Sequence, residues 1–564
     1  MGQKVICNGK LISLTDRDYV TAGGEGKIFV KSGLVYKVYH DPMPSGKEQK
    51  LKSLSVLSHK VIVAPKDLLY SQSGEPVGYT MPFVDNSSAL ALLFTSSFKK
   101  RNSITRDNLD AIFLGMSETM SYIHGKDILV VDANELNFLV SNADWETVHF
   151  IDVDSFQTKG FPANAIMPSI KDFRATSFSR ETDWYSFSVL MFQLYTGIHP
   201  YLGTHPKYNV HLDNGKEVKF DDIESRRKAL VSVYNKDVRY PPCVKVTEIP
   251  AGLKDWFVEM FEDGKSSPPP ASIAKRQAPT QVTTYSSQGI TEVLLKEFDE
   301  VIRRVKFIRG QLLVVTDSTY WLGSQRHVKA FQKELPIVFE RNGNVSILHA
   351  AMEGEYIWSD LDGTKSKDLV PGLLGIGAMN NRLFALADGT LREYRIGKWT
   401  NSLSVVSSWN VLARASKFYP GCVYCDSFGT ALFYVAETKD GGDVLHVLKV
   451  PELDGHLVLD VLYSNGTLLA ISANKGKYVK TTVKFDDLFL KYSIDQTHCE
   501  LQEINATVTG SGMMVLLDRD SMELSAKGSV NKKVVKVNTD LLLASRGTEV
   551  LGFRDKSLLK LTLD

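Results

Sequence analysis

The sequence predicts a mixed α+β domain of residues 1–262, a linker of residues 263–288 and an all-β domain of residues 289–564. Three observations support this division. The first part combines apolar strand patterns with long helical periods. The linker is rich in Pro, Ser and Thr and has no apolar period, which is typical of a connector. The last part contains short β-type runs separated by Gly, Asn and Asp turns.

The composition is that of an ordinary globular protein. The 564 residues are 43% hydrophobic and 23% charged, and this length allows more than one domain. The net charge of +1 does not indicate nucleic-acid binding, and no apolar run is long enough to span a membrane. The first ten residues contain no signal region, and the 5 cysteines are too scattered for a disulfide framework. We therefore expect a cytoplasmic protein.

A glycine-rich turn is the first candidate for ligand binding. It contains Gly23, Gly24 and Gly26 and lies directly before a strand expected at residues 28–30. Because glycine has no Cβ, its backbone N–H groups can come close to a phosphate. A plain hairpin turn explains the same residues, so the turn alone does not indicate a nucleotide.

Lys37 strengthens the case for phosphate binding. It lies in the middle of an apolar strand expected at residues 34–39, where an unpaired lysine is costly. A phosphate and a carboxylate would compensate its charge. Residues 45–57 have a helical period that includes Glu48, which is the expected acidic partner. The alternative is a Glu48 side chain that faces solvent.

Acidic and amide side chains flank the next pair of strands. Two short strands are expected at residues 138–140 and 148–151, joined by a polar turn that suits a hairpin. Such a hairpin would bring Asp132, Asn137 and Asp152 to one edge, where their oxygen atoms suit Mg²⁺. An ordinary Asp/Asn-rich turn beside buried strands is the alternative.

These motifs, in this order, resemble those of the protein-kinase superfamily. The likeness covers residues 20–262 and is greatest with bacterial and phage kinase-like proteins. The segments that carry it are GGEG (23–26), D-x-N-x-x-N (132–137), I-D-x-D-S-F (151–156) and DVRYPP (237–242). The resemblance implies a bilobal protein-kinase-like fold that binds ATP and Mg²⁺ and transfers a phosphoryl group, most often to protein Ser or Thr.

The resemblance also implies roles for the phosphate-side residues. Lys37 would bind the α- and β-phosphates beneath the glycine turn and pair with Glu48. Asp132 would orient the acceptor hydroxyl and take its proton. The metal ligands would be Asn137, Asp152 and Asp154. For Asp154, which replaces the Gly of the usual Asp-Phe-Gly, capping of the next turn is the alternative role.

The same resemblance also implies which residues contact adenine and which helices form the core of the second lobe. Met81 would be the gatekeeper, and the backbones of Pro82 and Val84 would meet the adenine edge. A long helix is expected at residues 109–124. A buried central helix is expected at residues 182–203, where Asp183 would brace the catalytic loop.

Several residues depart from the kinase pattern. The His and Arg that usually precede the catalytic Asp are Val130 and Val131, and the Lys usually found two residues after it is Asn134. Three functions therefore stay open. They are a Ser/Thr protein kinase-like enzyme, a pseudokinase scaffold that binds proteins, and a small-molecule kinase.

The last part of the sequence predicts repeated sheets. Its clearest β-rich runs start near residues 301, 369, 457 and 537, roughly two units of forty residues apart, and about forty residues is the size of a propeller blade. This spacing favours a six- or seven-bladed β-propeller over a pair of β-sandwiches. Because propellers usually bind proteins, the domain is expected to recruit a protein substrate or partner. Cys422 and Cys425 form a C-x-x-C that fits strand residues better than a metal site.

Overall fold

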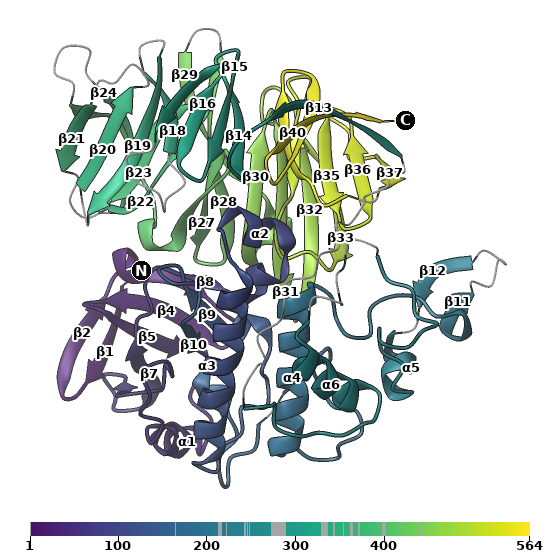
Figure 1. The fold of residues 1–564 in the computed structure, drawn as a ribbon. Helices are drawn as coiled ribbons and strands as arrows, with labels where there is room; N and C mark the ends of the chain where they lie inside the picture. Colours follow the sequence, from purple (N-terminus) through teal and green to yellow (C-terminus); the bar gives the residue numbers. More distant parts are fainter. Residues whose placement is uncertain are drawn as a thin grey trace.

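The structure is a computed structural model of the whole chain. It describes residues 2–163, 165–211, 217–221, 223–241, 244, 246, 249–271, 289–328, 337–341, 344–352, 355–360, 365–369, 373–387, 389–396, 402–439, 442–537 and 539–563. Figure 1 shows a mixed α+β part in the lower half and a part built of strands above it. An α+β region followed by a β-rich region is therefore confirmed. Among the described residues, no helix is long and apolar enough to cross a membrane.

A seven-stranded antiparallel sheet begins the α+β part. From edge to edge its strands are β2 (Lys10–Leu14), β1 (Gln3–Cys7), β6 (Leu68–Tyr70), β7 (Pro76–Pro82), β5 (Leu34–Tyr39), β4 (Gly26–Lys31) and β3 (Tyr19–Ala22). The expected strands at residues 28–30 and 34–39 are confirmed as β4 and β5. Helix α1 (Lys47–Leu54) is shorter than the expected period, because its N-terminal neighbour Gly46 has φ +86°, outside the helical region.

The rest of the α+β part is mainly helical. Its helices are α2 (Ser96–Arg101), α3 (Arg106–His124), α4 (Arg180–Thr196), α5 (Ile223–Lys228) and α6 (Ala251–Phe261). Two small sheets accompany them, in the orders β10 (Val148–Phe150), β9 (Phe138–Ser141), β8 (Ser87–Ala89) and β11 (Asn209–His211), β12 (Glu217–Asp221). The hairpin β9–β10 and helix α3 confirm the sequence predictions. The central helix expected at residues 182–203 is confirmed as α4 only as far as Thr196, so its predicted end is wrong. Helix α4 is buried along almost its whole length and ends at Gly197, which has φ +74°.

Within the described residues, the C-terminal part contains seven four-stranded antiparallel sheets. Six of them use consecutive strands: β14 (Ile302–Ile308), β15 (Gln311–Thr316), β16 (Thr319–Leu322), β17 (Gln325–Val328); β18 (Ile337–Arg341), β19 (Asn344–Met352), β20 (Glu355–Asp360), β21 (Lys365–Leu369); β22 (Leu373–Met379), β23 (Arg382–Ala387), β24 (Thr390–Ile396), β25 (Leu403–Asn410); β26 (Ser416–Tyr419), β27 (Cys422–Ser427), β28 (Thr430–Lys439), β29 (Gly442–Lys449); β30 (Leu457–Ser464), β31 (Thr467–Asn474), β32 (Lys477–Phe485), β33 (Tyr492–Cys499); β34 (Ala506–Val508), β35 (Met514–Asp518), β36 (Ser521–Ser525), β37 (Lys532–Lys536).

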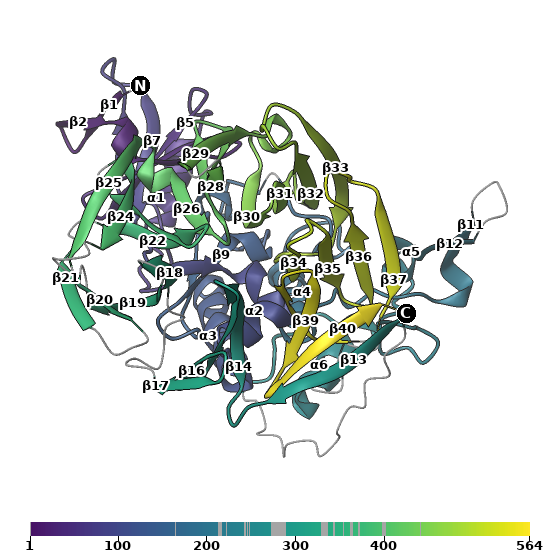
Figure 2. The ribbon, with the colours of Figure 1, turned by 90° about the horizontal axis from the view of Figure 1, so that it is seen from above.

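The seventh sheet joins the two ends of this part of the chain. Its order is β13 (Ile290–Glu297), β40 (Ser557–Leu563), β39 (Glu549–Arg554) and β38 (Leu542–Arg546). Viewed from above in Figure 2, the sheets lie around a common centre. A buried apolar cluster lies between each pair of neighbouring sheets. The C-terminal part is therefore a closed ring, because its first strand completes the sheet formed by its last three.

The ring contacts the α+β part directly. Helix α2 points toward the ring in Figure 1 and lies beneath its centre in Figure 2. The guanidinium of Arg101 forms an ion pair with Glu503, and Nζ of Lys100 lies 2.8 Å from Oδ2 of Asp540. At another point, Oγ1 of Thr21 donates a hydrogen bond to Asp426 at 2.8 Å. These contacts fix the ring on the α+β part at widely separated places.

The expected linker divides into two stretches. Residues 263–271 follow α6, and Nε1 of Trp256 donates to the carbonyl of Ser267 at 3.1 Å. The beginning of the linker thus packs back onto the α+β part. The remaining residues, 272–288, lie outside the described residues.

Candidate functional site

Asp183 holds the segment that leads into Asp132. It lies in the first turn of α4 and is fully buried, and its carboxylate accepts the backbone N–H groups of Val130 and Val131, each at 2.8 Å. Nε2 of His124 lies 2.9 Å from the same carboxylate. Val131 has φ +62°, which is unfavourable for a β-branched residue. The two hydrogen bonds from these N–H groups to Asp183 therefore stabilise a strained turn that sets the position of Asp132.

Asp132 and Asn137 lie together at one end of the β9–β10 hairpin. Nδ2 of Asn137 donates to the carbonyl of Asp132 at 3.0 Å. The N–H of Ile151 donates to the carbonyl of Asn137 at 3.0 Å, which brings Asp152 beside them. The hairpin therefore places Asp152 next to the segment that contains Asp132 and Asn137. That their three side chains meet at one metal stays a prediction.

The carboxylate of Asp132 is held on both oxygens. Oδ1 accepts the N–H of Met167 at 2.9 Å, and Oδ2 accepts Nδ2 of Asn134 at 2.9 Å. Burial raises the pKa of Asp132, and these two hydrogen bonds partly oppose that rise. A carboxylate oxygen has more than one lone pair, so each can accept one further hydrogen bond.

Lys37 connects the large sheet to the acidic motif. Its Nζ lies 3.0 Å from both carboxylate oxygens of Asp154, 3.3 Å from Oδ1 of Asp152 and 3.2 Å from Oε2 of Glu25. Burial alone would lower the pKa of Lys37, but these three carboxylates outweigh it and raise the pKa. Lys37 is therefore charged and attached to the motif that follows β10.

Asp154 is the most buried of the three carboxylates that contact Lys37. Its side chain is 1% exposed and accepts the hydroxyl groups of Tyr79 at 2.7 Å and Tyr39 at 2.9 Å, in addition to its contact with Lys37. Nζ of Lys47 lies 3.2 Å away. Burial would raise the pKa of Asp154, but the two lysines keep it below its usual value. Asp154 does not cap the following turn. Its oxygens instead contact the side chains of Lys37, Lys47, Tyr39 and Tyr79. Its role as a metal ligand stays a prediction.

The expected pair between Lys37 and Glu48 is not formed, so this prediction is wrong. Oε1 of Glu48 lies 2.7 Å from Nζ of Lys52 and accepts the hydroxyl of Tyr70 at 3.3 Å. The physical reason is the rotation of α1. Lys47 and Lys50 face the acidic motif, so Glu48 points away from it.

Of the two carboxylates expected to bind metal, Asp152 is the more exposed. It has φ +57°, and its side chain is 41% exposed. Partial loss of solvation and repulsion by Asp154 raise the pKa of Asp152 to about 7, despite the nearby charge of Lys37. Among the described residues, no group of three His, Cys, Asp or Glu side chains could hold a metal ion. A Mg²⁺ here would need oxygens from Asn137 and from phosphates as well, which fits its preference for a few protein ligands.

The glycine turn and the expected adenine side adjoin strands of the seven-stranded sheet. The N–H of Gly23 donates to the carbonyl of Gly26 at 2.9 Å, and a Cβ on Gly26 would lie 2.5 Å from the carbonyl oxygen of Val38. Gly26 is therefore required by the approach of β4 to β5, whereas Gly24 has open space around it. The end of β7 and the residues after it include Met81, Pro82 and Val84. Their contact with adenine stays a prediction.

Sequence reasoning missed the hydroxyl and amide groups that complete the site. Tyr39 lies two residues from Lys37 on β5, so strand alternation could have placed it on the same face. Tyr79 is paired with Lys37 across β5 and β7, and Met167 lies in a loop. Neither contact has a signal in the local sequence.

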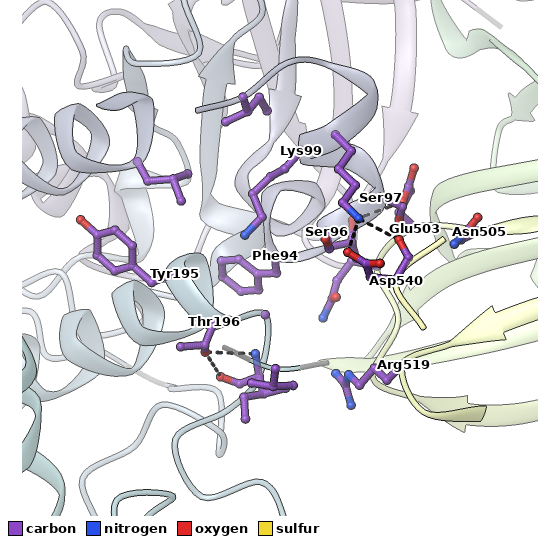
Figure 3. A pocket seen from close by; sticks show the side chains of 18 of the residues that line it. Phe94, Ser96, Ser97, Lys99, Tyr195, Thr196, Glu503, Asn505, Arg519 and Asp540 are labelled. Carbon is purple, nitrogen blue, oxygen red and sulfur yellow. Dashed lines mark hydrogen bonds and ion pairs between the residues drawn. The ribbon is translucent and has the colours of Figure 1, made fainter. Parts of the chain in front are cut away.

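A cavity of about 1010 Å³ separates α2 and the end of α4 from the ring. Figure 3 shows Ser96 and Ser97 of α2 beside Glu503 and Asp540 of the ring, with Arg519 of the ring lying apart from this group. Five cationic and five acidic side chains line it: Lys99, Lys100, Arg106, Arg303 and Arg519, and Asp107, Asp110, Glu500, Glu503 and Asp540.

Comparison with known proteins adds no further information about the site. The chain matches no protein-family model, and no curated protein is significantly similar to it.

Proposed function

We propose that residues 1–262 form a bilobal protein-kinase-like domain that binds ATP with Mg²⁺ and transfers a phosphoryl group to protein Ser or Thr. We further propose that the ring is a seven-bladed β-propeller that recruits a protein. The observation that carries the proposal is the convergence of two segments that are distant in the sequence, strand β5 and the β9–β10 hairpin with its flanking residues. Lys37 on β5 meets Asp152 after β10, and the same hairpin places Asp132 beside Asn137. Phosphoryl transfer needs mainly positioning and charge neutralisation, which such a set supplies.

Each side chain has a defined task in this proposal. Lys37 neutralises the α- and β-phosphates while Asp154 keeps its ammonium in place. Asn137 and Asp152 hold Mg²⁺, which neutralises charge on the transferred phosphoryl group. Asp132 orients the acceptor hydroxyl and takes its proton, and its raised pKa suits that transfer.

Calorimetry with full-length protein tests the nucleotide part of the proposal. ATP should bind in the presence of Mg²⁺, and Lys37→Ala should weaken binding by at least about tenfold, because a buried charge contact is lost. Lys52→Ala is the matched control, since Lys52 is exposed and pairs with Glu48 outside the cluster. An absence of binding by the unmodified protein would exclude the proposal.

A pseudokinase scaffold is the second candidate, and a specific observation favours it. Both carboxylate oxygens of Asp132 already accept hydrogen bonds, and Asn134 occupies the place of the usual phosphate-contacting Lys. In that case ATP binding would persist without transfer. The ring would then be the functional part, acting through protein contacts.

A further inference from the structure

The ring touches the catalytic segment of the α+β part at three points. The hydroxyl of Tyr478 on β32 donates to Oε1 of Glu135 at 2.5 Å, and Glu135 is buried. Leu136 packs against the apolar cluster between the sheets β30–β33 and β34–β37. In the turn between β31 and β32, a Cβ on Gly476 would lie 3.6 Å from Cε of Met167. The turn is therefore held in place against the segment that contains Asp132.

This turn lies close to the expected acceptor position. The backbone N–H of Met167 binds Oδ1 of Asp132 at 2.9 Å, so the residue that touches Gly476 also touches the expected base. Lys475 and Lys477 flank Gly476, and all three residues are exposed. A molecule that approaches Asp132 from this side would pass the turn in solvent.

The two lysines of the turn differ in their ion pairs from Lys480, a buried lysine of strand β32. No ion-pair partner of Lys475 or Lys477 is found among the residues that the structure describes. Further along β32, in contrast, Nζ of Lys480 is buried and lies 2.6 Å from Oε1 of Glu523. Exposed, unpaired cations next to a reactive group favour the approach of anions.

We propose that Lys475 and Lys477 form the acceptor side of the site and select an anionic phosphoacceptor, such as an acidic peptide. The proposal rests on the proposed function, because it takes Asp132 as the acceptor-side base. It assigns the ring a role in substrate selection through its β31–β32 turn. The acceptor's negative charge would pair with the lysines while its hydroxyl reaches Asp132.

Peptide binding to the full chain tests this proposal without catalysis. The probes are two fluorescein-labelled peptides of equal length, one alternating Asp and Ser and the other alternating Lys and Ser, measured by fluorescence anisotropy at low salt. The acidic peptide should bind more tightly. Lys475→Ala/Lys477→Ala should weaken the binding of the acidic peptide about tenfold, because each exposed ion pair raises the affinity a few-fold. Added salt should remove the difference in affinity between the unmodified protein and this variant.

A second double variant controls for general surface charge. Lys449→Ala/Lys556→Ala removes two exposed lysines from other sheets of the ring and should leave acidic-peptide binding unchanged. Melting temperatures of both variants confirm that each is folded. Equal binding of the two peptides, no acidic-peptide binding, or equal losses in the two double variants would overturn the proposal. Because nucleotide is absent, failure here is distinguishable from failure to bind ATP.

Discussion

Replacing Asp154 with Asn should destabilise the α+β part strongly. The substitution preserves shape but removes the negative charge that Lys37 and Lys47 share, at 3.0 and 3.2 Å. Because the Asp154 side chain is 1% exposed, solvent cannot replace it. Removing one partner of a buried ion pair costs about 3–5 kcal/mol, and we expect a loss of that size in the free energy of unfolding.

Glu48→Gln is the matched control for this experiment. The same assay, urea denaturation followed by tryptophan fluorescence, should detect no change in stability, because Glu48 pairs only with Lys52 and Tyr70 near the surface. A double-mutant cycle of Asp154→Asn with Lys37→Met should give a coupling energy of about 2 kcal/mol or more. Equal losses for Asp154→Asn and Glu48→Gln would refute the assignment of Asp154 as the partner of Lys37.

Three further outcomes are expected. Asp183→Asn leaves at least one of the N–H groups of Val130 and Val131 without an acceptor, so urea denaturation should show a loss of about 2–3 kcal/mol. Tyr478→Phe removes a hydrogen bond to buried Glu135 and should lower the melting temperature, whereas Tyr492→Phe, at an exposed tyrosine that binds Glu452, should not. The affinity for Mg²⁺-ATP, measured by calorimetry across pH, should fall by up to about tenfold per pH unit below about pH 7, because protonated Asp152 cannot bind the metal. An affinity independent of pH would contradict this use of Asp152.

The local elements of the α+β part were predictable from the sequence. Strands β4 and β5 and the β9–β10 hairpin follow from apolar periodicity and turn residues, whereas helices α3 and α4 were expected from the resemblance to protein kinases. The contact between Asp132 and Asn137 was predictable from the same hairpin, because both residues lie on one short segment. Local pattern was sufficient wherever the interacting residues are close in sequence.

The partner of Lys37 could not be predicted in this way. Its identity depends on the rotation of α1, which turns Lys47 instead of Glu48 toward the acidic motif. Asp154 also accepts a hydrogen bond from the hydroxyl of Tyr79. The position of Tyr79 depends on the pairing of β5 with β7. Such contacts depend on packing between distant segments, and helical period alone does not determine them.

The number of sheets in the ring could not be determined from the sequence either. Strand β13 completes a sheet whose other strands, β38–β40, come from the end of the chain, so that sheet is not one continuous repeat. The contact of the ring with the segment around Glu135 had no signal in the sequence either. Tyr478 and Glu135 are 343 residues apart, and neither is unusual in its own segment.

Transfer of labelled phosphate is the most direct test of the proposed function. Full-length protein is incubated with ATP labelled on the γ-phosphate, with and without Mg²⁺, and label on protein and released phosphate are both measured. Asp132→Ala is compared with Asp127→Ala, which removes an exposed aspartate that pairs with Arg180. We expect Mg²⁺-dependent transfer by the unmodified protein and by Asp127→Ala, and none by Asp132→Ala. Equal transfer by Asp132→Ala, or no transfer by any of the three, would contradict a phosphotransferase built on Asp132.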